Sequence, residues 1–551
     1  MRSTKTRRPT GRRHAGSASW RRACAATAAI GTWLWVASPA AAQPSPPTGT
    51  VRVAGFQVSG NSLLPAAEVD KVLMPLLGLR SMPELQRAAA AVQALYAEAG
   101  YGAVVAYVPP QTGSDGIVRI TVMEGKVAQV TVAGSRRYPE DRIKATLSDL
   151  VPGRTPRLDR IDTQLRMANE NPARQMQLLL QPGKHSGEAD ARITVEDLPT
   201  QRTTVGLDNT GSDRNGEYRA SLSWQHGNLS DRDDVASLQF QTSPTSPSQV
   251  KVLSAGYRLP MYSRHLVLDA FAAWSDVDGG TTPTFAGDLS FNGKGRIFGL
   301  RLAHYLRRWG EFDQRWAVGL DHRAYINRCT VAGLPEGACG PAGENVTVHP
   351  LTLDYSAQAG GRLSLGFNAS LLANLRLGGK DAGPDAFAAV RPGASPGYMA
   401  LRLGVVGGGQ IADEWTMRGR ITAQITGDAL VPGEQFGLGG ASSVRGYEER
   451  EVVGDTGAFA SIEVGSPSLL PADSGRRLTL LAFADAGLVR NQNDAACLDD
   501  RNRCSLASLG LGARFGAGNL QARIDLAYPM KSAARTQRHD PRAHFAVNYG
   551  F

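Results

Sequence analysis

Residues 520–528 have the sequence Leu-Gln-Ala-Arg-Ile-Asp-Leu-Ala-Tyr, in which apolar residues alternate with glutamine, arginine and aspartate. Successive side chains of a β-strand point to opposite faces, so Leu520 and Ile524 share one face while Arg523 and Asp525 share the other. One face therefore suits an apolar environment and the other a polar one. Alternation of this kind is typical of an amphipathic strand, and it decides the fold because it recurs.

The same alternation is found in sixteen segments after Thr200, including 217–225 and 415–425. A soluble sandwich would also alternate, but the number of segments is even and the last one, 544–551, ends in the aromatic Phe551. In lipid, only helices and closed barrels satisfy the backbone hydrogen bonds. We therefore predict an all-β, 16-stranded antiparallel transmembrane β-barrel over residues 200–551, with Phe551 as a C-terminal insertion signal.

The connections between these segments alternate between short and long. If the segments before residue 200 stay in the periplasm, every connection from an odd to an even strand faces outward, and the long connections all belong to this set. They lie near residues 275–294, 329–345, 378–397, 427–457 and 529–542. The strand count and the loop lengths therefore support the same topology.

The N-terminus is typical of a secretory signal peptide over residues 1–42. Its basic segment is followed by an apolar run from Ala23 to Ala37 and by three alanines that end at Ala42. Cleavage there removes eight of the 60 basic residues and no acidic one, which leaves 52 against 50 acidic residues. The high pI therefore reflects the signal peptide, and we expect no nucleic-acid partner.

Four of the five cysteines remain after this cleavage and form two close pairs, Cys329/Cys339 and Cys497/Cys504. In an exported chain such spacing predicts two local disulfides in outward loops. A metal site is the alternative, although no histidine lies near either pair. We expect no cofactor, no metal and no enzymatic activity, because no nucleophile–base–acid grouping or metal-ligand spacing is present.

A short proline-rich lead at residues 43–50 precedes a weak internal repeat with a period near 73 residues. The first copy covers residues 51–125 and begins with a strand at 51–58. The second copy covers residues 126–199. Each shows a β-α-α-β-β pattern, which predicts a small α+β domain with two helices on one face of a sheet.

Residues Val444-Arg445-Gly446-Tyr447 lie in the outward loop after the eleventh strand, at about 427–457. An arginine that folds back into the lumen needs a partner, and Asp485 is expected on the inward face of the thirteenth strand. Phe483 and Gly487 share that face with Asp485. Two alternatives remain open: Arg445 is exposed to solvent, or Arg418 and Arg420 compete for the same carboxylate. In the proposed pair, Phe483 and Tyr447 pack around the two charges and both glycines allow close backbone contact.

With these motifs the chain resembles the outer-membrane transporters of two-partner secretion, the TpsB family of haemolysin secretion/activation proteins. That family lies within the superfamily of barrel assembly and translocation proteins. Its loop motif matches residues 444–447, and its strand motif matches Phe483, Asp485 and Gly487. The repeats resemble polypeptide-transport-associated (POTRA) domains. The markers of the repeats are Gly60-Asn61, Tyr96, Pro110-Gln111, Glu124-Gly125 and Asn171-Pro172.

The resemblance implies a pore in the cell outer membrane with its POTRA domains in the periplasm. The modules would capture a large unfolded exoprotein with an N-terminal secretion domain, an adhesin or a haemolysin, and the barrel would secrete it to the cell surface. Partners would be this exoprotein, the outer-membrane lipid and, during biogenesis, the barrel-assembly machinery, and the transporter would be monomeric. Many relatives carry an N-terminal plug helix. Here only eight proline-rich residues precede Val51, so we expect the long loops to fill the pore.

Two other functions fit part of the pattern. A barrel-assembly factor of the same superfamily usually carries more POTRA domains, and its first domains lack the markers named above. A diffusion porin would have neither the POTRA modules nor the Val444–Tyr447 motif. The neighbouring reading frame would separate these possibilities, since an exoprotein transporter is expected beside a very large protein that carries a signal peptide.

Overall fold

The computed structural model describes residues 49–111, 115–212, 215–276, 280–284, 287–291, 294–326 and 340–551. The predicted signal peptide and the question of a plug helix lie outside these residues. None of the helices in the described ranges is long and apolar enough to cross a membrane.

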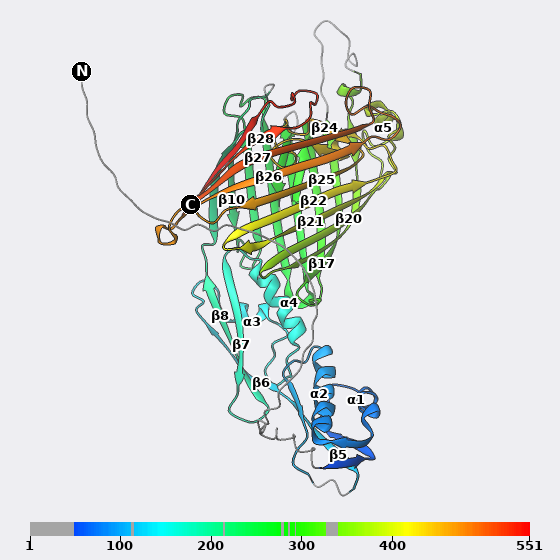
Figure 1. Cartoon of the computed structure of the whole chain (residues 1–551), viewed down its shortest axis with the longest axis vertical. Coiled ribbons are helices and arrows are strands. Elements are labelled where there is room, and N and C mark those ends of the chain that lie inside the picture. The colour runs from blue at the N-terminus through cyan, green and yellow to red at the C-terminus, as the bar shows by residue number, and fades with distance from the viewer. Residues whose placement is uncertain are drawn as a thin grey trace, which may run out of the picture. The chain divides into compact units, whose positions relative to one another are not determined.

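The first module is a three-stranded sheet covered by two helices (Figure 1). The strand order is β2-β5-β4, with β5 parallel to β2 and antiparallel to β4. A capping box between Ser81 and Glu84 begins helix α2. Alternate residues of β5, such as Ile120 and Val122, are buried against Val92 of α2. The elements are β1 (Thr50–Val53), β2 (Gly55–Ser59), α1 (Ala66–Leu73), η1 (Met74–Leu76), β3 (Gly78–Ser81), α2 (Met82–Glu98), β4 (Val104–Tyr107) and β5 (Ile117–Glu124).

The opening strand differs from the prediction. Residues 51–58 were expected to form one strand, whereas the structure divides them into β1 and β2 at Ala54. β1 pairs with β3 in a separate two-stranded sheet, and β2 pairs with β5. The amide of Ala54 donates to the carbonyl of Gly116 at 2.7 Å, so the chain changes partner at this residue. Sequence alternation continues through such a change of partner and therefore does not reveal it.

The second module repeats this architecture with strand order β6-β8-β7. Its core includes Ile143 from α3, Ile161 from α4 and Ile193 from β8. The elements are β6 (Lys126–Ala133), α3 (Glu140–Thr146), α4 (Leu158–Asn169), β7 (Arg174–Pro182) and β8 (Glu188–Asp197). In both sheets the central strand is the last one in the chain, β5 or β8, so β2 and β4 form the edges of the first sheet and β6 and β7 those of the second.

The described residues after the second module form a closed antiparallel barrel of sixteen strands, with the short β18 (Val346–Val348) as an extra partner of β17 (Figure 1). The strands are β9 (Gln201–Asp208), β10 (Arg219–His226), β11 (Val235–Thr242), β12 (Lys251–Met261), β13 (Leu266–Asp276), β16 (Lys294–Tyr305), β17 (Asp313–Ile326), β19 (Pro350–Ala359), β20 (Leu363–Asn374), β21 (Met399–Ala412), β22 (Trp415–Ile425), β25 (Thr456–Gly465), β26 (Arg476–Arg490), β27 (Arg503–Ala517), β28 (Leu520–Pro529) and β29 (Arg542–Gly550). The predicted fold class is confirmed.

The barrel closes where β29 pairs with β9, with Asn548 opposite Gly206. Phe551 continues this pairing, because its amide donates to the carbonyl of Thr203 at 2.9 Å. The ring of Phe551 is 64% exposed and lies beside that of Tyr549, on the outer face. Both aromatic rings therefore face the lipid, as the alternation of the last strand predicted.

The second module contacts the periplasmic turns of the barrel. Asn171 donates to the carbonyl of Gly227 at 2.8 Å and to that of Asp233 at 3.0 Å. Arg174, whose side chain is fully buried, donates to the Asp233 carboxylate at 2.6 Å. Glu170 accepts from Arg258 of β12 at 3.0 Å. Polar contacts thus connect the residues at the start of β7 to the first and second periplasmic turns of the barrel.

Candidate functional site: the lumen loop and its arginine

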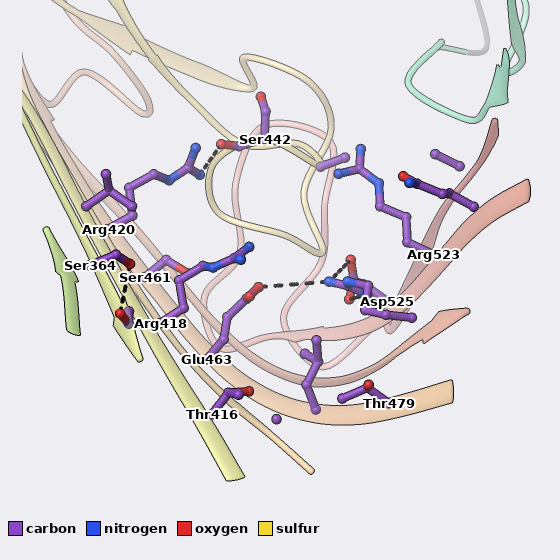
Figure 2. A pocket seen from close by; sticks show the side chains of 18 of the residues that line it. Ser364, Thr416, Arg418, Arg420, Ser442, Ser461, Glu463, Thr479, Arg523 and Asp525 are labelled. Atoms are coloured by element: carbon purple, nitrogen blue, oxygen red, sulfur yellow. Dashed lines mark hydrogen bonds and ion pairs between the residues drawn. The ribbon is translucent and has the colours of Figure 1, made fainter. Parts of the chain in front are cut away.

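The long loop between β22 and β25 forms one end of a cavity inside the barrel. It contains η4 (Pro432–Glu434), β23 (Phe436–Leu438) and β24 (Val452–Gly454), and the last two pair with each other. The cavity has a volume of about 1960 Å³, and its lining extends from the periplasmic turn at residues 359–362 to loop residues 441–443. Figure 2 shows Ser442 of the loop at this cavity. The loop therefore lies within the lumen, in agreement with the expectation that long loops fill the pore.

Arg445 and Asp485 form a bidentate ion pair inside the barrel. Nε of Arg445 lies 2.7 Å from Oδ2 of Asp485, and Nη2 lies 2.8 Å from Oδ1. The Arg445 amide also donates to Oδ2 at 3.2 Å. Arg445 is 5% exposed and Asp485 is 2% exposed, so the pair is removed from solvent. Two parallel charge-assisted hydrogen bonds in this environment fix the position of the loop on strand β26.

The guanidinium of Arg445 has further partners. Nη1 donates to Glu463 of β25 at 2.7 Å and lies 3.7 Å from Asp525 of β28. Its carbon lies 3.4 Å from the centre of the Phe483 ring, which gives a cation–π contact. The alternative of a solvent-exposed Arg445 is therefore wrong in this structure. One arginine joins the loop to three barrel strands.

The two motif glycines lie where a side chain would collide. Gly446 has a φ of +90°, and a Cβ there would meet Ala527 at 3.1 Å. A Cβ at Gly487 would lie 2.6 Å from Leu438 of the loop. The Gly446 amide also donates to Nε2 of His544 at 2.9 Å. Glycine at these positions allows the loop to lie directly against β26 and β28.

Tyr447 does not pack around the ion pair, which corrects that part of the hypothesis. Its ring belongs to a buried cluster with Val444, and its hydroxyl lies 2.9 Å from the carbonyl of Lys531 in the loop after β28. The physical reason is the direction of the chain at Gly446, because the left-handed residue turns Tyr447 away from Arg445. Val444 and Tyr447 thus attach the loop through apolar contacts on either side of the charged contact of Arg445.

The predicted competitors lie elsewhere in the lumen. Arg420 donates to the carbonyl of Ser442 in the loop and lies 4.9 Å from the centre of the Phe459 ring. Arg418, on the same strand, points into the cavity (Figure 2). Ser461 donates to Asp485 at 2.6 Å. Arg445, and not Arg418 or Arg420, therefore binds the Asp485 carboxylate.

Sequence reasoning missed a second buried carboxylate in the same loop. Glu434 is 1% exposed and accepts from Arg323 at 2.8 Å, from Arg402 at 3.0 Å and from the hydroxyl of Tyr325 at 2.8 Å. The signal that could have found it is the inward position of Arg323 and Arg402 in their strands, since each of them needs an anion.

A third ionic contact joins two outward loops. Arg391 follows helix α5 (Pro384–Val390) and binds the carboxylate of Asp455 through both terminal nitrogens. It also donates to the carbonyl of Leu430 at 2.6 Å. The loop between β22 and β25 is thus held at its start, its middle and its end. Its attachment does not depend on Arg445 alone.

The predicted disulfide between Cys497 and Cys504 is present in the outward loop between β26 and β27. Cys504 contributes to the same buried cluster as Tyr447. The predicted pair Cys329/Cys339 lies outside the described residues.

Several POTRA-like markers have clear structural roles in the first module. Glu124 at the end of β5 accepts from the amide of Leu63 at 2.9 Å, from Ser62 and from the hydroxyl of Tyr96 at 2.8 Å. Burial acts to raise the pKa of Glu124, but these hydrogen bonds outweigh it and hold the pKa below the ordinary value. A Cβ at Gly60 would lie 2.2 Å from the carbonyl oxygen of Val122. These residues bind the turn after β2 to the sheet.

Comparison with known protein families identifies the chain. Residues 187–515 match the model of the haemolysin secretion/activation protein family ShlB/FhaC/HecB, which is more than half of the chain. The chain belongs to this family. Residues 51–125 match the ShlB-type POTRA domain. It is thus an outer-membrane β-barrel transporter of the two-partner secretion type, with its POTRA domains in the periplasm.

Individual relatives agree with this membership. The chain is 26% identical over 514 residues to the outer membrane transporter CdiB of Escherichia coli, which covers 89% of this chain and 83% of that protein. It is 22% identical over 478 residues to the heme/hemopexin transporter protein HuxB of Haemophilus influenzae, at 82% and 78% coverage.

Solved structures show the same fold. CdiB from Escherichia coli superposes with a TM-score of 0.77 at 20% identity and covers 94% of this chain and 93% of that one. CdiB from Acinetobacter baumannii gives 0.70 at 16% identity, with 91% and 90% covered.

Proposed function

We propose that this transporter captures one unfolded exoprotein in the periplasm through its POTRA modules and secretes it through the barrel to the cell surface. The proposed cargo is a large adhesin or haemolysin with an N-terminal secretion domain. The observation that carries this proposal is the lumen loop, which lies inside a sixteen-stranded barrel and is attached to its wall by polar contacts. Such polar contacts can break and form again, so the loop can move aside as a chain passes. The hydrogen-bonded strands of the barrel wall cannot move aside in this way.

The edge strands of the two modules offer a way to hold an extended chain. β4 and β7 each pair with a neighbour on one side only in their sheets. β7 is nine residues long, and Leu179 in its middle is 54% exposed. An extended segment that adds to this edge would gain main-chain hydrogen bonds while its apolar side chains contact Leu179. We propose β7 as the main capture edge.

We further propose that the protein works as a monomer, has no enzymatic activity and is itself inserted by the barrel-assembly machinery, with Phe551 as part of the insertion signal. The exposed aromatic pair Tyr549 and Phe551 on the closing strand supports this role. A transporter needs no bond-making chemistry, because the folding of the cargo outside the cell can draw the chain through the pore.

A deletion strain that expresses the neighbouring large reading frame tests the function. Loss of the exoprotein from the cell surface, restored by this gene, is the expected result. Unchanged amounts of other outer-membrane barrels are expected at the same time. A fall in those barrels with normal exoprotein export would instead indicate an assembly factor.

A photo-crosslinking residue tests the capture edge. Placed at Leu179 of β7, it should crosslink to the exoprotein during export. The matched control is the exposed position Glu140 on helix α3, which lies away from the edge strand. Equal crosslinking at both positions would contradict capture by β7.

A further inference from the structure

The cavity inside the barrel has an excess of positive charge. Its lining contains eight arginines and five carboxylates, and no lysine or histidine. The arginines are Arg219, Arg362, Arg418, Arg420, Arg445, Arg477, Arg514 and Arg523. The carboxylates are Asp208, Asp313, Glu449, Glu463 and Asp525. The lining residues therefore carry three more positive than negative charges.

The carboxylates of this lining are already engaged. Glu463 and Asp525 bind Arg445 and Arg514 at 2.7 Å in each case. Asp313 binds Arg308 of the periplasmic turn at 2.7 Å. The remaining two accept hydrogen bonds from neighbouring groups of the chain. Glu463, Asp525 and Asp313 thus neutralise the cations next to them, whereas Asp208 and Glu449 accept from backbone amides, and the lining keeps its excess of positive charge.

Several arginines of the lining have no such partner. Within the described residues, Arg362, Arg418, Arg477 and Arg523 form no ion pair within 4.0 Å. Figure 2 shows Arg418 and Arg420 on one wall and Arg523 on the opposite wall, with their side chains directed into the space between. The guanidinium groups of Arg418 and Arg523 therefore face one another across the open part of the lumen.

Hydroxyl groups occupy much of the remaining wall. Ser364, Thr416 and Thr479 lie on three different strands around the same space (Figure 2). They can exchange hydrogen bonds with any extended backbone without selecting a sequence. The charge of the wall, and not its hydroxyl groups, is therefore what can distinguish one passing segment from another.

A narrow passage with low-dielectric walls focuses the field of such charges, so it concentrates anions and repels cations. We propose that the lumen is an anion-preferring conduit and that the exported chain crosses it as segments rich in acidic, hydroxyl and amide side chains and poor in lysine and arginine. The part that concerns the cargo rests on the proposed function. The anion preference of the lumen does not.

Ion selectivity in planar lipid bilayers under a KCl gradient is the first test. For the full-length protein we expect chloride to be at least about twofold more permeant than potassium, since the lumen field favours anions. Arg418→Glu with Arg523→Glu should bring the ratio below one, and the two Arg→Gln changes should give an intermediate value. The control is Arg476→Glu, next to Arg477 but outside the cavity lining. A cation preference in the wild-type protein would overturn the proposal.

Thiol labelling is the second test and does not require an open pore. Thr479→Cys is introduced into a chain in which Cys329 and Cys339 are serine. A negatively charged methanethiosulfonate reagent should label this thiol about two to ten times faster than a positively charged one, after correction with free cysteine. The Arg418→Glu/Arg523→Glu background should reverse the order. Equal rates in both backgrounds would contradict the inferred field.

Export of modified cargo separates this inference from the proposed function. An exoprotein with a short acidic insert should reach the surface severalfold faster than one with a basic insert of equal length, and the Arg418→Glu/Arg523→Glu transporter should reduce the difference. Equal export of both inserts would contradict the inference about the cargo but would leave the proposed transport function supported. If no cargo is exported but the pore prefers chloride, the proposed transport function is contradicted and the anion preference of the lumen is not.

Discussion

Arg445 in the outward loop and Asp485 on strand β26 are joined by two parallel hydrogen bonds of 2.7 and 2.8 Å, although forty residues separate them in the chain. Arg445 also binds Glu463 on β25 at 2.7 Å. The loop is therefore attached through one side chain to two adjacent strands of the barrel wall. Because both members of the central pair are buried, neither can be removed without leaving the other in a water-poor environment.

We expect Arg445→Ala to leave the barrel in the membrane but to reduce export sharply. The variant leaves Asp485 buried without its cation, and breaking such a pair costs about 3–5 kcal/mol. The released loop would then no longer take its place against β26. Surface exoprotein and the heat-modifiable band of the folded barrel are measured together. The exposed Arg538→Ala in the loop after β28 is the control, and normal export by Arg445→Ala would disprove the role of this contact.

A double-mutant cycle should show that Arg445 and Asp485 act as a pair. Asp485→Ala leaves Arg445 with Glu463, so we expect it to destabilise the barrel less than Arg445→Ala does. The double variant should then be more stable than the sum of the single effects predicts, with a coupling of about 0.5–3 kcal/mol. The midpoint of heat modification measures each variant. Strict additivity would count against the pairing.

Glu434→Gln should loosen the outer part of the loop without removing the Arg445 contact. The change keeps the size of the side chain but deprives Arg323 and Arg402 of their shared anion, and hydrogen bonds to charged groups contribute about 1.5–3 kcal/mol each. We expect faster cleavage of the loop by protease added to whole cells. Glu414→Gln, in the exposed turn between β21 and β22, is the matched control. Unchanged protection in Glu434→Gln would show that Glu434 does not hold the loop.

The contrast between these two loop contacts shows what sequence can predict here. The pair of Arg445 and Asp485 could be predicted from the sequence for two reasons. Strand alternation fixes the face of the strand on which Asp485 lies, and the odd–even strand count fixes the side of the membrane on which the loop lies. Glu434 lies in a segment rich in proline and glycine, and its partner Arg323 is 111 residues away on another strand. A loop has no periodicity, so its contacts depend on a path through space that residue patterns do not encode.

The same limit applies to the first module. Its two helices and its central strand agree with the β-α-α-β-β pattern that hydrophobic spacing predicted for residues 51–125. The change of partner at Ala54 does not follow, because β1 and β2 have equal alternation and differ only in which strand accepts their hydrogen bonds.

The turn after β2 should become less stable in acid because of Glu124. Hydrogen bonds from Ser62, Leu63 and Tyr96 lower the pKa of Glu124 in the folded state despite its partial burial. A lowered folded-state pKa means that the ionised carboxylate contributes stability above the unfolded-state value of 4.5, and that this contribution is lost as the pH falls through the folded-state pKa.

Backbone hydrogen exchange of residues 60–64, corrected for the intrinsic rate, should therefore accelerate below about pH 4.5 in the full-length protein. Glu124→Gln should exchange faster at neutral pH and lose this acid dependence, whereas the exposed Glu68→Gln should behave as the wild type does. An identical acid profile in Glu124→Gln and the wild-type protein would show that another group controls this turn.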